Sequence, residues 1–240
     1  MAISFTNDVV NTRRRVHQFF LAITVFLIAT VVVGFWPTYF GQLVRGGVTR
    51  PWIIHVHGAV FSGWMALLLL QVSLAATGRV RLHRRIGTVG MAYGVIVLLL
   101  GTIVSFAAPV LHMRAGEWTL DVAAAFLLLP LVDMILFAGF FGAAVAYRNT
   151  PEVHKRLILA ATVALAFAAV ARMNLHPIPF LALWLSPLAA AMMFDLATRG
   201  RVHTVNVVST TILALAFVRI FFMESEAWLA IGRALLGPFL

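Results

Sequence analysis

Histidine is the only strong nitrogen ligand in this 240-residue chain, which contains eight histidines and no cysteine. Four of them directly follow an apolar residue at the start of a long apolar run: His17, His83, His154 and His203. Imidazoles held at one depth on several helices can converge on one metal ion or cofactor. Their arginine and lysine neighbours offer the alternative that these histidines simply occupy a membrane surface. The pattern therefore predicts either an inner ligand cluster or a set of headgroup residues.

Ionisable residues also occur within the apolar runs, where charge is expensive and usually functional. They are His55, His57, Asp133, Arg172, Asp195 and Arg219. Asp133 falls near the centre of its run, so we expect it to pair with Arg219 or Arg172, because an arginine in hydrocarbon needs an anionic partner. Residues two apart on a regular helix differ by about 200°. His55 and His57 therefore cannot chelate one ion together. We favour His57 as the one that serves a site.

Two candidate sites follow from these residues. The outer one, for a cofactor, comprises His57, Asp133, Arg172, His176 and Arg219. The inner one, for a metal ion, comprises His83, His154, His203 and Asp195. Three of His17, His83, His154 and His203, together with Asp195, would supply ligands and leave a coordination position for water, as catalytic zinc requires.

The elements that carry these residues are transmembrane helices. Hydrophobic residues make up 62% of the chain and charged residues only 11%. Apolar runs of this length match the roughly 30 Å hydrocarbon core of a bilayer. We predict an all-α, polytopic bundle forming a single domain over 1–240, with a last stretch, "AWLAIGRALLGPFL", that is too short to span and lies at the interface. The seven predicted spans are 16–36, 52–77, 86–108, 120–147, 154–173, 178–198 and 203–223.

The basic residues predict how the bundle is oriented. The net charge of +10 resides largely in short loops, where it meets anionic lipid rather than nucleic acid. Twelve of the 18 basic residues fall on one side of the predicted membrane. They are Arg13, Arg14, Arg15, Arg79, Arg81, Arg84, Arg85, Arg148, Lys155, Arg156, Arg199 and Arg201. The positive-inside rule then predicts a cytoplasmic N-terminus and an external C-terminus.

Several chemistries are excluded by missing motifs. The sequence lacks HExxH, GxSxG and the clustered histidines of membrane desaturases. Its only lysine, Lys155, lies at a helix end, so a retinal Schiff base in mid-membrane is excluded. Cysteine-ligated iron–sulfur clusters are excluded as well.

The stretches "LHRRIG", "PEVHKRLILAATVALAFAAVAR" and "FDLATRGRVH" resemble a group of uncharacterised bacterial multi-spanning membrane proteins, over about residues 52–230. That resemblance implies a bacterial membrane bundle and transfers no activity. Histidines at both membrane faces also resemble, more loosely, transmembrane b-type cytochromes. This second likeness implies haem b and a membrane redox partner or quinone.

Three functions remain open at this point. The first is a redox protein that binds haem b or a metal ion, with arginines as partners for haem propionates. The second is a zinc-dependent membrane hydrolase with its site near the cytoplasmic face. The third is a non-enzymatic transporter, proton pathway or accessory subunit, in which the Asp/Arg/His network is a relay or a structural lock.

Overall fold

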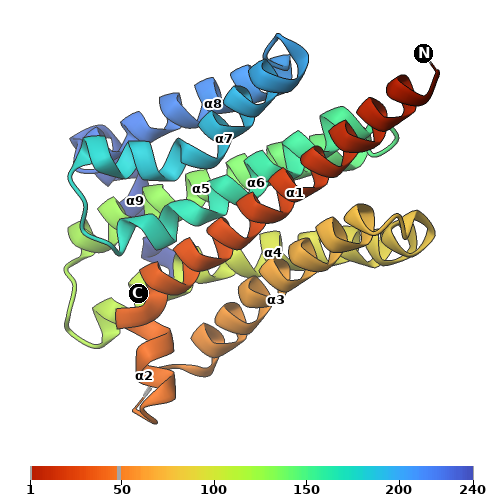
Figure 1. Cartoon of the computed structure of the whole chain (residues 1–240). Coiled ribbons are helices and arrows are strands. Elements are labelled where there is room, and N and C mark those ends of the chain that lie inside the picture. Colours follow the sequence, from red (N-terminus) through yellow and green to blue (C-terminus); the bar gives the residue numbers. More distant parts are fainter. Residues whose placement is uncertain (1, 48–49, 240) are drawn as a thin grey trace.

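The computed structural model describes residues 2–47 and 50–239, with side chains from Arg14 onward. Every regular element in this part of the chain is a helix (Figure 1). The long helices are α1 (Ala2–Phe35), α3 (Trp52–Ala76), α4 (Val80–Arg114), α5 (Leu120–Ala146), α6 (Pro151–Ala171), α7 (Pro177–Arg199) and α8 (Thr204–Phe217). The short ones are η1 (Trp36–Phe40), α2 (Gly41–Val44), η2 (Val218–Phe221), α9 (Glu226–Leu236) and η3 (Gly237–Phe239).

Seven of the described helical segments are long and apolar enough to cross a membrane. The prediction of a polytopic helical bundle is thereby confirmed. Five spans, with α8 counted together with η2, begin and end within three residues of their predicted bounds, but α4 is much longer than predicted. Its 35 residues extend about 52 Å at 1.5 Å per residue, beyond the roughly 30 Å hydrocarbon core. Both ends of α4 therefore reach past the apolar layer.

The first span also differs from the prediction at its outer end. The first span was predicted to end at Trp36, yet the chain stays helical as far as Val44. Pro37 lacks the N–H that an α-helix would use there, and the backbone accommodates it in a π-helix, η1. The side chain of Arg13, counted on the inner side, lies outside the described side chains.

Helix α6 is the central element of the bundle. It packs against α1, α5, α7 and α8, and α5 in turn packs against α4 (Figure 1). More than half of its residues are buried, and five of these are alanines, whose small side chains let neighbouring backbones approach closely. The closest approach is at Gly34 of α1, where a Cβ would collide with the backbone carbonyl of Ala169. This packing fixes which face of each neighbour points inward.

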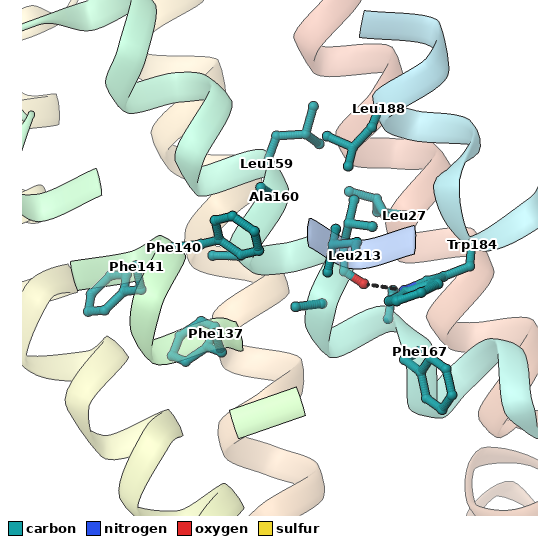
Figure 2. Close-up of a cluster of buried hydrophobic side chains, with 14 of the residues drawn as sticks. Leu27, Phe137, Phe140, Phe141, Leu159, Ala160, Phe167, Trp184, Leu188 and Leu213 are labelled. Atoms are coloured by element: carbon teal, nitrogen blue, oxygen red, sulfur yellow. Dashed lines mark hydrogen bonds between the residues drawn. The ribbon is translucent and has the colours of Figure 1, made fainter. Parts of the chain in front are cut away.

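Large side chains fill the space around α6 (Figure 2). Phe137 of α5, Leu27 of α1, Trp184 of α7 and Leu213 of α8 are all at most 1% exposed. The Trp184 indole Nε1 donates a hydrogen bond to the Val163 carbonyl at 2.7 Å, so its one polar atom is paired within the apolar core. Trp64 and Met65 of α3 and Val97 of α4 belong to the same cluster, so all seven long helices share one core.

Helix α9 lies against the outer end of α5. Leu229, Gly232 and Leu236 are buried there, and a Cβ at Gly232 would come within 2.8 Å of the Ala124 Cβ. The Trp228 indole donates to the Ala124 carbonyl at 2.8 Å. The last stretch is thus too short to span, as predicted, and is held by direct contact with α5.

Candidate functional site

Asp133 and Arg219 form a buried ion pair between α5 and the 3-10 helix η2, which directly follows α8. Arg219 Nη2 donates to Asp133 Oδ1, and the two side chains are only 5% and 6% exposed. Asp133 is the middle residue of the 27-residue helix α5, about 20 Å from either end at 1.5 Å per residue. The expected partnership of Asp133 with an arginine is present, and the arginine is Arg219.

The Arg219 guanidinium is incompletely paired. Its Nε and Nη1 are buried without a hydrogen-bond partner, and within the described part of the chain its one ion pair is with Asp133. One face of the group lies over the Phe167 ring, with Cζ 4.2 Å from the ring centroid. A planar guanidinium offers a fork of donors that suits a carboxylate or phosphate. The site therefore has unused donors for an acceptor-bearing ligand.

Pro130 lies one turn from Asp133 inside the same helix. A proline lacks the N–H that would bond to the carbonyl four residues earlier, here that of Phe126. Such irregular backbone at membrane depth is tolerated where protein or water satisfies it. Helix α5 is thus locally weakened next to its buried carboxylate.

The other outer residues do not join the ion pair. Arg172, the other predicted partner of Asp133, caps α6, donates to the Ala168 carbonyl at 2.7 Å and lies 4.2 Å from the Phe35 ring centroid. His57 stacks against Phe61 at 4.1 Å, and its buried Nδ1 has no partner. Arg172 is close enough to His57 for their charges to interact. These two residues form a second outer group.

The remaining outer histidines have separate surroundings. His55 Nδ1 is 3.0 Å from the Tyr39 hydroxyl, which links α3 to the π-helix η1. His176 is exposed and is the N-cap residue of α7. Neither residue contacts His57 through a described hydrogen bond.

Asp195 is the centre of an inner polar network. Arg156 donates to both of its carboxylate oxygens, and the two side chains are only 2% and 1% exposed. The Asn206 amide and the His203 backbone N–H donate to Asp195 Oδ2 at 2.8 and 3.2 Å. Glu152 completes the network by pairing with Arg156. The network ties α6 to α7 and α8, and it already uses the lone pairs that a metal ion would need.

His203 caps α8 rather than facing a metal site. Its Nδ1 accepts a hydrogen bond from the Val205 backbone N–H at 3.2 Å. Burial lowers the pKa of His203 below its ordinary value of 6.5, and the nearby Arg156 guanidinium lowers it further. The neutral ring is therefore favoured, which is the form that leaves Nδ1 free to accept.

His83 and His154 lie close enough for their charges to interact. Each makes a contact to the preceding helix: His83 Nδ1 is 3.2 Å from the Gln71 carbonyl, and His154 Nδ1 is 2.8 Å from the Ala144 carbonyl. Among the described residues, no group of three or more His, Asp or Glu side chains could hold a metal ion. The inner metal site stays a prediction without support from this geometry.

Sequence reasoning missed three residues of the inner network. Arg156 was counted only as a topology-determining charge, and Glu152 and Asn206 were not considered. The spacing of Glu152 and Arg156, four residues apart, was a usable signal, because such pairs face each other on a helix. Asn206 gave no comparable signal.

Comparison with protein-family models, curated proteins and solved structures found no match. The class of protein is accordingly defined by the fold and the sites alone: a multi-pass helical membrane protein with one buried ion pair at mid-depth and a second near its arginine-rich end.

Proposed function

We propose that this protein is a proton-coupled carrier of organic anions, with Arg219 binding the anion and Asp133 binding the proton. The observation that supports this proposal is the pair of buried Arg219 nitrogens without partners beside a single carboxylate. Buried ionisable residues at membrane depth are retained chiefly for such roles.

Charge balance provides the coupling. In the resting pair, Asp133 and Arg219 carry opposite charges that cancel. A carboxylate that binds the free Arg219 nitrogens would bring a net negative charge into a medium of low dielectric, at a large cost. Protonation of Asp133 removes that charge. One proton should therefore bind with each anion and leave with it.

Orientation in the bilayer is part of the proposal. We place the protein in the bacterial cytoplasmic membrane, with the arginine-rich end of the bundle and the N-terminus inside. The chain has no cysteine, so single substitutions Arg45→Cys and Asn149→Cys can be labelled selectively. An impermeant maleimide should label the first in intact cells and the second only after lysis. The reverse result would invert the topology.

The coupling is tested with pyruvate as the probe. Calorimetric titration of the detergent-solubilised protein, in two buffers of different ionisation enthalpy, counts the protons bound per pyruvate. The wild type should take up about one proton at pH 7, Asp133→Asn should bind pyruvate without proton uptake, and Arg219→Gln should not bind. Asp133→Glu keeps a carboxylate and should restore coupling, whereas Asp121→Asn, at the edge of α5, should match the wild type.

Transport is tested in proteoliposomes with radiolabelled pyruvate. An inwardly directed proton gradient should drive uptake by the wild type and by Asp121→Asn, and Arg219→Gln should be inactive. Equal uptake by Arg219→Gln, or pyruvate binding without any proton uptake by the wild type, would rule out the proposed mechanism.

A second candidate is the haem b redox protein, with a membrane redox partner or quinone. It is favoured by His57, whose buried Nδ1 is unpaired, and by the nearby Arg172, which could hold a propionate. The fit is partial: His55 is engaged by Tyr39 and His176 is exposed, so neither offers an evident second axial ligand. A reduced-minus-oxidised absorption spectrum of wild type and His57→Ala decides this candidate. The hypothesis of a zinc-dependent hydrolase is tested by metal analysis of the same protein.

A further inference from the structure

A groove runs along the outside of the bundle between α5 and α8, with a volume of about 400 Å³. Helices α5 and α8 both pack against α6, which forms the floor between them. The walls include Ile135, Leu136 and Gly139 of α5 and Val208, Ser209 and Ile212 of α8. Its volume falls within the roughly 300–1,000 Å³ range of small-molecule sites.

The groove leads toward the buried ion pair. Asp133, Leu136 and Phe140 are spaced three and seven residues apart and therefore share one face of α5. Ile212 and Arg219 are seven residues apart and lie on nearly the same face of the α8–η2 segment. The Asp133–Arg219 contact then lies beyond one end of the groove, where Ile135 of α5 and Ile212 of α8 are the last lining residues.

We propose that the groove and the ion pair form one site for a long-chain fatty acid. The carboxylate would bind the free Nε and Nη1 of Arg219, and the alkyl chain would lie in the groove. This proposal rests on the proposed function and deepens it by naming the class of anion. The lining is almost entirely apolar, and Ile135 and Ile212 are 68% and 40% exposed on its rim, which allows lateral entry from the bilayer.

Charge complementarity selects a monocarboxylate over a neutral lipid. The apolar groove leads toward a cation with unused donors, and Asp133 can take one proton and thereby compensate one negative charge. A single carboxylate has one negative charge, whereas a phosphate monoester bears up to two. A neutral amphiphile would leave the site without its charge partner.

Chain length provides the test. Binding of radiolabelled butyrate and dodecanoate is measured by scintillation proximity on the full protein in phosphatidylcholine nanodiscs, with empty nanodiscs subtracted. Each methylene removed from water favours binding by about fourfold. The wild type should therefore bind dodecanoate at least about a hundredfold more tightly than butyrate, and Arg219→Gln should bind neither.

Gly139→Phe separates the groove from the ion pair. A Cβ at Gly139 meets nothing within 4 Å, so a larger side chain enters the groove without disturbing the bundle. This variant should lose dodecanoate affinity at least tenfold and keep butyrate affinity. Gly142→Phe is the matched control, because Gly142 is equally open, lies on the same helix and does not line the groove. Ile212→Trp narrows the groove independently from α8 and should behave like Gly139→Phe.

The two proposals fail in different ways. If dodecanoate and butyrate bind equally to the wild type, or if Gly139→Phe and Ile212→Trp leave dodecanoate binding unchanged, the groove assignment is wrong, while proton-coupled pyruvate binding can stand. If dodecyl phosphate binds as tightly as dodecanoate, the assignment to a fatty acid is wrong. If Arg219→Gln retains butyrate and pyruvate binding, both proposals fall.

Discussion

Replacement of Asp133 by asparagine is the most direct test of the buried ion pair. The substitution keeps the shape of the side chain and removes its charge, leaving the Arg219 guanidinium buried with no anion and with Nε and Nη1 still unpaired. Loss of one partner of a buried pair costs about 3–5 kcal/mol, because the remaining charge is uncompensated. The Phe167 ring face offsets only a small part of this cost.

The free energy of unfolding is measured by titration with sodium dodecyl sulfate in mixed micelles, followed by tryptophan fluorescence. The control is Asp121→Asn, which removes a carboxylate from the exposed Asp121–Arg233 pair and should leave the unfolding midpoint nearly unchanged. The double variant Asp133→Leu/Arg219→Met removes both charges and should recover most of the stability lost by Asp133→Asn. Equal, small effects of Asp133→Asn and Asp121→Asn would show that Asp133 is solvated and that the argument from burial fails.

Three further outcomes are expected from the same unfolding assay. Asp195→Ala should lose about 1–3 kcal/mol, because buried donors of Arg156 and Asn206 would lose their acceptor while Glu152 still compensates the Arg156 charge; no loss would mean that water replaces Asp195. Gly34→Val should cost at least about 1–3 kcal/mol by overpacking against α6, whereas Gly139→Val, which faces open space, should be tolerated; equal effects would contradict the close approach of α1. The pKa of His203 is lowered in the folded protein, so the unfolded chain binds more protons below about pH 6.5. Neutral His203 therefore contributes to the free energy of unfolding above pH 6.5, and this contribution is lost as the pH falls below that value. His203→Asn keeps a capping acceptor and should reduce this acid sensitivity relative to wild type; an unchanged pH profile would show that the histidine does not titrate on unfolding.

The order and approximate limits of the spans could be read from the sequence because hydropathy over about 20 residues is a local property. Local sequence patterns did not predict features that depend on contacts between helices or on a non-α backbone geometry. Pro37 suggested the end of a helix, and the structure instead continues through a π-helix to Val44. The last stretch was predicted from the sequence only to lie at the interface. The burial of Gly232 against Ala124 shows that the position of this stretch depends on its contact with α5.

The ion pair at mid-depth was predictable in kind, because a charge in hydrocarbon requires an opposite charge and Asp133 was the central carboxylate. The choice between Arg219 and Arg172 was not, since it depends on how far α8 and α6 are rotated about their axes. The inner histidines illustrate the same limit. Sequence placed His83, His154 and His203 at one depth, but depth leaves the direction of each imidazole undetermined.

The sequence by itself determined that seven segments are long and apolar enough to cross a membrane, which residues lie at which height along each segment, and that buried charges among them must be compensated. Tertiary structure alone decided that Arg156 and Asp195 pair, that two nitrogens of Arg219 stay unpaired, and that a groove separates α5 from α8. The physical reason is that depth follows from the rise along each helix, whereas contact depends on the rotation and separation of neighbouring helices. Those are set jointly by many small packing contacts, such as Gly34 against Ala169.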